Sequence, residues 1–377
     1  MRLAAILTSA PLKNYCSCAP LQMPTQHAVN IEPGSEEAVE GCVKVSMVNL
    51  SSEGARMSRR LGVIMDPIAG IKPKKDTTLA LLLAAARHGF ELHYMEMSDL
   101  SLRDGRVCAR TRPLTVHNSL DHWFDFEGPQ LTIAEPLASF DCILMRKDPP
   151  FDMEYVFATY MLERAQAEGT LVVNDPRSIR DASEKLFTAW FADVCPPTLV
   201  TRNMDELRAF QQEHRDIVVK PLDGMGGASV FRVRPDDGNA SVIFETITEL
   251  EQRYCMAQRY LPAILEGDKR ILVVDGEPLP YSLARIPASG ELRGNLAAGG
   301  RGVPQALTAS DRAIAERVAP ELKKRGLIFV GLDVIGDRLT EINVTSPTCA
   351  REIEAQYDID IGGLLMQAIE KRLTARR

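Results

Sequence analysis

From residue 60 to residue 174 the chain alternates short apolar runs with amphipathic stretches, and this alternation restricts its fold more than any other feature. The predicted strands cover residues 61–65, 90–95, 142–145 and 171–174, and the strongest predicted helices cover residues 76–88 and 153–168. Strands that alternate with helices of this length favour a parallel sheet with right-handed crossovers. Ligands of such sheets bind beyond the carboxyl ends of the strands, so we expect a site near Asp66, Arg146 and Asn174.

After a predicted connecting helix over residues 183–192, the pattern changes to pairs of strands joined by turns. The pairs are 217–220 with 229–233, 270–274 with 278–285, and 330–334 with 339–344. Asp275-Gly276 between two apolar runs is typical of a β-hairpin. We therefore expect a second, mixed α/β unit, with a cleft between it and the first.

The first 56 residues show neither pattern, and Met57 is a plausible start just before the first strand. The apolar run that opens the chain ends at Thr8, which is too short for the apolar region of a signal peptide. We expect a disordered extension or an upstream start over residues 1–57. An organelle or regulatory segment is the alternative, but no motif supports it.

Charge and cysteine usage exclude several classes of protein. A net charge of −7 does not provide the broad positive field that non-specific nucleic-acid or membrane-surface binding needs, and no apolar run approaches the roughly 18 residues of a membrane span. The eight cysteines are scattered and form no Cys-x-x-Cys pair. They favour reduced thiols in a cytoplasmic protein over a zinc site or a disulfide scaffold.

The segment from Lys220 to Ser229 reads Lys-Pro-Leu-Asp-Gly-Met-Gly-Gly-Ala-Ser. Three glycines within four positions let a backbone turn present successive N–H groups to phosphate oxygens. The segment is neither a Walker A loop nor a Gly-x-Gly-x-x-Gly turn, because the lysine precedes the glycines. It favours a strand–loop–strand cover over a nucleotide; a glycine-rich hairpin with a solvated lysine is the alternative.

Asp333, Glu341 and Asn343 offer oxygen ligands of the kind that Mg²⁺ prefers. A two-residue turn at residues 336–337 would place Asp333 on the face opposite Glu341, whereas a three-residue turn would set the two side by side. We therefore expect the three-residue turn, and a two-residue turn would argue against the three-ligand site. Exposed surface carboxylates are the alternative.

The long segment over residues 286–302 contains five glycines, and three arginines lie in it or next to it. Such a segment is typical of a lid that closes over a reactive intermediate, or of a solvated loop. Arg270 and Arg285 could converge on phosphate or carboxylate groups, or could form surface ion pairs. Residues 345–348 precede a helical stretch and could hold a carboxylate or cap the helix.

Taken in order, several segments resemble an ATP-grasp carboxylate–amine ligase: Lys185, Lys220, the glycine loop, residues 256–261, residues 267–270 and Glu341-Ile342-Asn343. Within that superfamily, residues 145–152, 285–302 and 339–348 are closely similar to bacterial glutathione synthetases. The similarity runs from about residue 60 to about residue 372, and the first 56 residues have no counterpart.

The resemblance implies an α/β, ATP-grasp fold. An N-terminal parallel-sheet domain of the pre-ATP-grasp, Rossmann-like type would span residues 58–182. An ATP-grasp domain with mixed and antiparallel α+β subdomains would span residues 183–372. Its nucleotide-covering subdomain would span residues 183–262 and its catalytic subdomain residues 263–372, with a lid over residues 286–302.

It also implies an ATP-dependent ligase that joins γ-L-glutamyl-L-cysteine to glycine through an acyl phosphate. Another ATP-grasp ligase, of the D-alanine–D-alanine or protein-tail glutamate type, is the alternative. A non-catalytic ATP-binding module is disfavoured because both lysines and all three metal ligands are present. The family further implies two Mg²⁺ ions, for which Mn²⁺ could substitute, and a cytoplasmic homotetramer without nucleic-acid or membrane partners.

The resemblance assigns a role to each candidate residue by its position. Phosphate binding falls to Lys185, Lys220, Gly224, Gly226 and Gly227. Adenine and ribose binding falls to Gln258, Arg259, Tyr260, Leu261 and Asp268. The γ-phosphoryl group and the reacting carboxylate would meet Arg270, Arg285 and Arg293. Mg²⁺ would be held by Asp333, Glu341 and Asn343, and the peptide substrate by Arg146, Ser346 and Thr348.

Overall fold

The computed structural model describes residues 59–128, 134–291, 293–294, 296 and 299–376, all within the unit that spans residues 56–377. The predicted extension over residues 1–57 lies outside the described residues.

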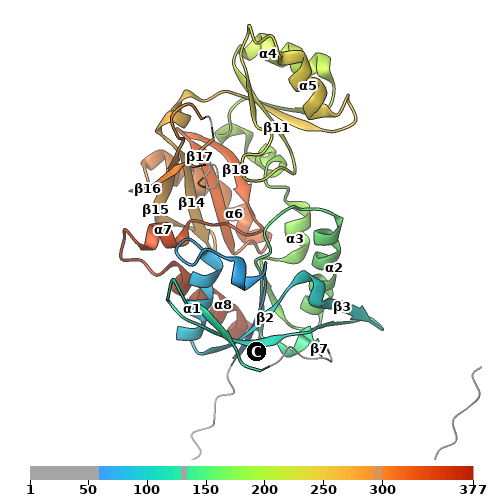
Figure 1. The fold of residues 1–377 in the computed structure, drawn as a ribbon, viewed down its shortest axis with the longest axis vertical. Helices are drawn as coiled ribbons and strands as arrows, with labels where there is room; N and C mark the ends of the chain where they lie inside the picture. The colour runs from blue at the N-terminus through green and yellow to red at the C-terminus, as the bar shows by residue number, and fades with distance from the viewer. Residues whose placement is uncertain (1–58, 129–133, 292, 295, 297–298, 377) are drawn as a thin grey trace, which may run out of the picture. The chain divides into compact units, whose positions relative to one another are not determined.

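The first sheet has six strands in the order β6-β5-β2-β1-β8-β9 (Figure 1). They are β1 (Arg59–Ile64), β2 (Phe90–Met95), β5 (Arg112–Val116), β6 (Phe124–Phe126), β8 (Cys142–Met145) and β9 (Leu171–Val173). The pairs among β2, β1, β8 and β9 are parallel, which confirms the predicted core of this sheet. Strands β5 and β6 extend it with antiparallel pairing that was not predicted, because short strands rather than a helical crossover follow β2.

Helices cover both faces of this sheet. Helices α1 (Thr77–Arg87) and α8 (Ile361–Ala375) pack together over one face, and α2 (Met153–Ala167) and α3 (Pro176–Asp181) lie over the other. The carboxylate of Asp76 accepts from Leu79 N at 2.6 Å and starts α1, and Asp152 starts α2 in the same way. Helices α1 and α2 were predicted from the sequence and are confirmed.

The second sheet is antiparallel and has the order β10-β13-β11-β12. It consists of β10 (Thr198–Thr201), β11 (Ile217–Pro221), β12 (Phe231–Val233) and β13 (Cys255–Arg259). Helices α4 (Met204–His214) and α5 (Ala240–Thr248) share a hydrophobic core with it and lie beside β11 in Figure 1. The glycine loop joins β11 to β12.

The third sheet is also antiparallel, in the order β16-β15-β14-β17-β18. Its strands are β14 (Asp268–Val274), β15 (Glu277–Ile286), β16 (Arg301–Ala306), β17 (Phe329–Ile335) and β18 (Arg338–Asn343), and α6 (Ala309–Lys324) packs on one face. The predicted two-residue turn at Asp275-Gly276 is confirmed, because Val274 pairs with Glu277 and both turn residues have positive φ.

Several shorter elements complete the described chain. A small antiparallel sheet holds β3 (Leu100–Arg103), β4 (Arg106–Ala109) and β7 (Glu135–Pro136), and α7 (Ala350–Glu354) follows the third sheet. The 3₁₀ turns are η1 (Ile68–Gly70), η2 (Met97–Asp99), η3 (Leu137–Ser139), η4 (Leu186–Val194) and η5 (Pro262–Glu266). The helix predicted over residues 183–192 is therefore wrong in type: η4 is a 3₁₀ segment interrupted at Phe191, whose ring is buried.

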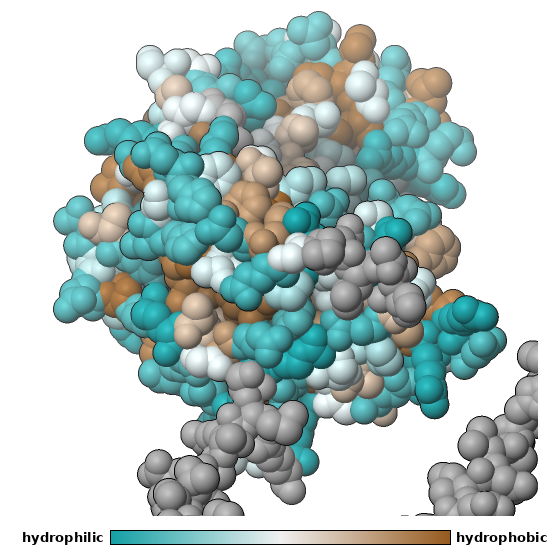
Figure 2. All heavy atoms as spheres, turned by 60° about the horizontal axis from the view of Figure 1, so that its bottom comes forward, coloured by the Kyte–Doolittle hydropathy of each residue, from teal (hydrophilic) through white to brown (hydrophobic). Residues whose placement is uncertain are grey.

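Hydrophilic side chains cover most of the face drawn in Figure 2. Among the described residues, each helix is too short or too polar to cross a membrane. Among the described cysteines, Cys142, Cys195, Cys255 and Cys349 are buried free thiols and Cys108 is partly exposed. The other three cysteines lie outside the described residues.

Candidate functional site

Strands of the second and third sheets, and segments that follow β1 and β8 of the first sheet, line a cavity of about 840 Å³. Every residue to which the resemblance assigned a role lines it, as does Asp66, which lies two residues after β1. Asn174 is an exception among the strand-end residues. Its side chain is buried and bonds the backbone of β17 and of Val344, so it holds two sheets together instead of facing a ligand.

The β17–β18 hairpin determines whether the predicted metal ligands share a face. Its turn contains two residues, Gly336 and Asp337, because Ile335 pairs with Arg338. The predicted three-residue turn is therefore wrong. A regular ladder that started from this turn would have placed Asp333 away from Glu341.

A shift in the pairing at Thr340 restores the arrangement. Beyond this β-bulge Asp333 pairs with Glu341 and Gly331 with Asn343, so the three oxygen-bearing side chains meet on one side of the sheet. The Thr340 hydroxyl donates to the Asp333 carbonyl oxygen at 3.1 Å, and Lys220 donates to the Thr340 carbonyl oxygen at 3.3 Å. The extra residue at the bulge thus sets Asp333 beside Glu341, as a three-residue turn would have done.

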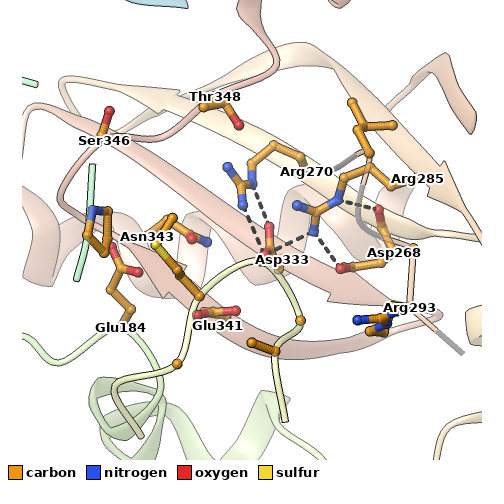
Figure 3. A pocket seen from close by; sticks show the side chains of 18 of the residues that line it. Glu184, Asp268, Arg270, Arg285, Arg293, Asp333, Glu341, Asn343, Ser346 and Thr348 are labelled. Atoms are coloured by element: carbon orange, nitrogen blue, oxygen red, sulfur yellow. Dashed lines mark hydrogen bonds and ion pairs between the residues drawn. The ribbon is translucent and has the colours of Figure 1, made fainter. Parts of the chain in front are cut away.

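Two buried arginines converge on Asp333 (Figure 3). Arg270 contacts both of its carboxylate oxygens, and Arg285 Nη2 lies 2.9 Å from Oδ2. Arg285 also donates to the Asp268 carboxylate. The predicted convergence of Arg270 and Arg285 is therefore present, and Asp268, which the resemblance placed near a ribose, bonds Arg285 in this structure.

Burial and charge act in opposite directions on these carboxylates. Burial alone would raise the pKa of Asp333, but Arg270 and Arg285 outweigh it and hold that pKa well below the usual range. For Asp268 burial prevails, helped by the negative Asp333, and raises its pKa to about 6. Asp268 Oδ1 is buried without a partner among the described residues, so this carboxylate is incompletely satisfied.

We expect Asp268→Asn to change the pH dependence of stability in protein freed of nucleotide and metal. The folded-state pKa of about 6 exceeds the ordinary value of 3.8, so the folded protein binds more protons and wild-type stability falls as pH rises between these values. The variant side chain does not titrate. Its free energy of unfolding relative to wild type should therefore rise across this window and level off above about pH 6. Urea unfolding at stepped pH measures this, and a difference that is constant with pH would contradict it.

Two lysines lie close to Glu341 at the glycine loop. Lys185 Nζ is 3.0 Å from Glu341 Oε1 and also donates to the Gly224 carbonyl oxygen. Lys220 is buried, and burial together with the nearby Lys185 lowers its pKa although Glu341 opposes this. The two ammonium groups thus form a concentrated positive charge at the loop that was predicted to cover phosphates.

The glycine loop and the lid segment touch each other. Gly226 and Gly227 have φ of 64° and 77°, and a Cβ on Gly227 would come within 2.9 Å of the Arg293 side chain. A Cβ on Gly294 would come within 2.2 Å of the Arg285 carbonyl oxygen. Gly227 and Gly294 therefore permit the close approach of the glycine loop to Arg293 and of Gly294 to β15.

At the end of β13, two backbone N–H groups of the predicted adenine-binding segment already donate to carbonyl oxygens of the protein. Arg259 N donates to Pro197 O at 3.0 Å and Tyr260 N to Asp216 O at 2.9 Å. The Arg259 side chain is exposed. An adenine bound here would have to be read through carbonyl groups or through Leu261, which also lines the cavity.

Arg146 is buried and holds the segment that follows β18. It donates to Thr78 Oγ1 at 3.1 Å and to Pro347 O at 2.9 Å, and Ser346 Oγ donates to the Arg146 carbonyl oxygen at 3.2 Å. Burial lowers the pKa of its guanidinium. Thr348 bonds the sulfur of Cys349 at 3.7 Å. These contacts give Arg146 a positioning role whether or not it also touches a substrate.

Glu184 was missed by the sequence argument. Its carboxylate accepts from Val344 N and from the N–H and hydroxyl of Thr345, so it holds the same segment from the other side. Burial, followed by the charge of Glu341, raises its pKa. Its place directly before Lys185 was the only signal available. Further cavity residues before and at the start of α1 were missed as well: Lys72, Lys75, Asp76, Thr77 and Thr78.

Two regions of the chain match models of known protein families. Residues 60–180 match the family model described as "Prokaryotic glutathione synthetase, N-terminal domain", and residues 184–358 match the corresponding "ATP-grasp domain". The glutathione synthetase of Citrobacter rodentium is 66% identical over 314 residues, which cover 83% of this chain and 99% of that protein. That of Escherichia coli K12 is 64% identical and is covered to 98%.

Solved structures with lower sequence identity share the fold. The D-cycloserine synthetase DcsG superposes with a TM-score of 0.60 at 16% identity, over 83% of this chain and 99% of that one. The ATP-grasp ligase PsnB, complexed with a minimal precursor variant, Mg and ADP, gives a TM-score of 0.56 at 20% identity, over 83% and 98% of the two chains.

Proposed function

This chain belongs to the prokaryotic glutathione synthetase family, and from that premise we propose a role for each part of its pocket. The enzyme joins γ-glutamylcysteine to glycine at the expense of ATP. The observation that carries the proposal is that every residue assigned by resemblance lines one cavity. Identities of 64–66% to glutathione synthetases favour this reaction over that of another ATP-grasp ligase.

The residues of the β17–β18 hairpin fit Mg²⁺. All three donors are oxygens, and Asn343 uses its Nδ2 to bond Gly331 O at 3.2 Å, which leaves its carbonyl oxygen as a ligand. Asp333 has two oxygens with about four acceptor sites, so the two arginines do not exhaust it. Asp333, Glu341 and Asn343 would hold the metal, two ions in our proposal with Mn²⁺ able to substitute. Mg²⁺ would supply charge that offsets the negative phosphate oxygens.

The lysine pair and the glycine loop would bind the ATP phosphates. Lys185 and Lys220 carry positive charge beside backbone N–H groups that glycine makes accessible, and Gly224, Gly226 and Gly227 would face the phosphates. Gln258, Arg259, Tyr260 and Leu261 would enclose the adenine. The main role of Asp268 would be to position Arg285, to which it is hydrogen-bonded. Contact with the ribose would be a second role.

The reaction needs no nucleophilic side chain. A carboxylate oxygen of the substrate cysteine attacks the γ-phosphorus as the bond to the bridging oxygen of ADP breaks. The glycine amine then attacks the acyl carbon, loses a proton, and expels phosphate with the former carboxylate oxygen. Arg270, Arg285 and Arg293 would stabilise the charge on the transferring phosphoryl group, and Arg146, Ser346 and Thr348 would hold the peptide.

The lid protects the acyl phosphate from water, and Gly294→Ala is expected to weaken it. The new Cβ would meet the Arg285 carbonyl oxygen and push the lid away. Glutathione formed per ADP should fall several-fold while ATP binding changes little, as measured by parallel assays of both products. Gly70→Ala is the control, because Gly70 lines the cavity and a Cβ there meets nothing within 4 Å. Unchanged coupling in Gly294→Ala would argue against a water-excluding lid.

Substrate omission tests the function itself. ADP release should be fast only when γ-glutamylcysteine and glycine are both present, and glutathione should appear in step with it. Alanine, D-alanine and glutamate as acceptors separate this reaction from the alternative ligases. Steady ADP release without γ-glutamylcysteine would refute the function. Formation of a D-alanine dipeptide would refute it as well.

We further propose a homotetramer in the cytoplasm. The tetramer is implied by family resemblance and is tested by light scattering coupled to gel filtration. Cytoplasmic location is supported by the buried, unpaired thiols of the described chain.

A further inference from the structure

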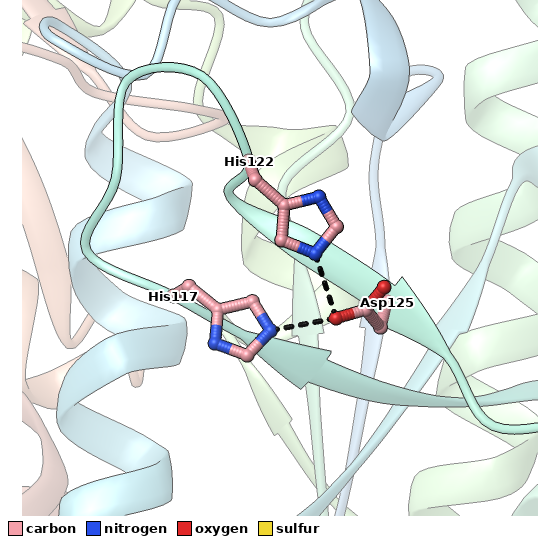
Figure 4. A group of neighbouring side chains, drawn as sticks. All are labelled: His117, His122 and Asp125. Carbon is pink, nitrogen blue, oxygen red and sulfur yellow. Dashed lines mark hydrogen bonds and ion pairs between the residues drawn. The ribbon is translucent and has the colours of Figure 1, made fainter.

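A cluster of two histidines and an aspartate lies on the β5–β6 hairpin, outside the cavity (Figure 4). His117 follows β5, His122 lies in the connecting loop, and Asp125 is in β6. Both imidazole Nε2 atoms contact the same carboxylate oxygen, Asp125 Oδ2, at 2.8 and 2.9 Å. The rings stack with centroids 5.3 Å apart. Three ligand atoms of the kind found in metal sites therefore converge on one point.

The hairpin backbone holds these side chains in place. His117 N donates to Trp123 O at 2.9 Å, and Ser119 Oγ accepts from the N–H groups of Asp121 and His122. Thr115 pairs with Asp125, so Asp125 and His117 lie on the same face of the ladder. The inward face of the ladder packs against the core through other residues, including Leu114 and Phe126.

We propose that His117, His122 and Asp125 bind a divalent transition metal of the Zn²⁺, Ni²⁺ or Cu²⁺ class. Two imidazoles and one carboxylate suit such ions, whereas Mg²⁺ prefers an all-oxygen shell. Ligand bonds of about 2.1 Å in tetrahedral geometry place ligand atoms about 3.4 Å apart. The present contacts would need to open by roughly half an ångström. The side chains are 40%, 66% and 53% exposed, so they are free to do so and to leave the remaining positions to water.

The loop that carries this site is tied to two walls of the substrate cavity. Trp123 Nε1 donates to Ile68 O at 2.9 Å, close to the cavity residues Gly70 and Ile71. Asn118 Oδ1 accepts from Arg351 at 2.6 Å, next to the cavity residue Glu352. A metal that fixes the hairpin would thus fix a brace between these walls, which makes it a candidate regulatory ion.

Calorimetric titration of the full-length, reduced protein with Zn²⁺ tests the proposal. Saturating Mg²⁺ and a non-hydrolysable ATP analogue occupy the substrate cavity during the titration. Wild type should bind one Zn²⁺ at the hairpin, and His117→Ala, His122→Ala and Asp125→Asn should each weaken this event by at least about tenfold, since even outer-shell changes cost that much. His88→Ala is the matched control, because His88 bonds the single carboxylate of Glu370 and should bind Zn²⁺ like wild type.

A Co²⁺ spectrum of the same proteins identifies the ligands. The site is supported if the wild-type Co²⁺ spectrum has no sulfur charge-transfer band and if this spectrum disappears in His122→Ala. The proposal is overturned by absence of Zn²⁺ binding in wild type, by binding that the three variants leave unchanged, or by a thiolate band. The readout is metal binding, so it stands or falls independently of the ligase function.

Discussion

Asp333→Asn is expected to lower the ligation rate by about a thousandfold and to destabilise the protein by about 3 kcal/mol. The variant removes a proposed metal ligand and leaves Arg270 and Arg285 facing a neutral amide in a buried site. Removing one partner of a buried ion pair costs about 3–5 kcal/mol. Arg285 keeps its contact with Asp268, so we expect a loss at the low end of this range. Steady-state kinetics and urea unfolding measure the two effects.

The control for this variant is Asp193→Asn. Asp193 also binds an arginine, Arg317, but its side chain is 57% exposed. Solvent-exposed ion pairs contribute little to stability because water screens them, so this variant should stay close to wild type in both assays. If Asp333→Asn were equally mild, Asp333 would be neither a metal ligand nor the centre of the arginine cluster.

Lys220→Met is expected to lower kcat/KM for ATP by about a hundredfold to a thousandfold without loss of stability. Within the described part of the chain, Lys220 makes one hydrogen bond, to Thr340 O, and its burial is unfavourable to the charged form. A methionine fills a similar volume without that cost, so the denaturant midpoint should stay or rise while phosphate binding is lost. This separation of activity from stability distinguishes a binding lysine from a structural one.

Lys323→Met provides the comparison for this second variant. Lys323 binds Glu277 at the surface, with half of its side chain exposed. Its loss should leave the kinetics for ATP as in wild type. Wild-type kinetics in Lys220→Met would remove Lys220 from the phosphate site.

The order of strands and helices could be predicted because each signal is local. Helix α1 begins at a capping Asp76 and Gly89 follows its end with positive φ, and an Asp-Gly turn closes the β14–β15 hairpin. The η4 segment could not be predicted as 3₁₀, because its apolar composition suits an α-helix equally well. Tertiary packing of Phe187 and Phe191 decides its form.

The candidate site shows where a local argument stops. The sequence placed Asp333, Glu341 and Asn343 on neighbouring strands but could not show the bulge at Thr340, because no residue type near the turn signals where the pairing shifts. The function of Asn174 was misjudged for a similar reason. A strand-end asparagine can face a ligand or bond a neighbouring sheet, and only the fold distinguishes the two.

The central claim is that a carboxylate oxygen of γ-glutamylcysteine becomes part of the released phosphate. It is tested most directly with γ-glutamylcysteine labelled with ¹⁸O at the cysteinyl carboxylate, ATP, glycine and Mg²⁺, followed by ³¹P NMR of the products. An acyl phosphate intermediate predicts one ¹⁸O in each inorganic phosphate released with glutathione, and none in ADP. Unlabelled phosphate, or label carried by AMP, would contradict the account.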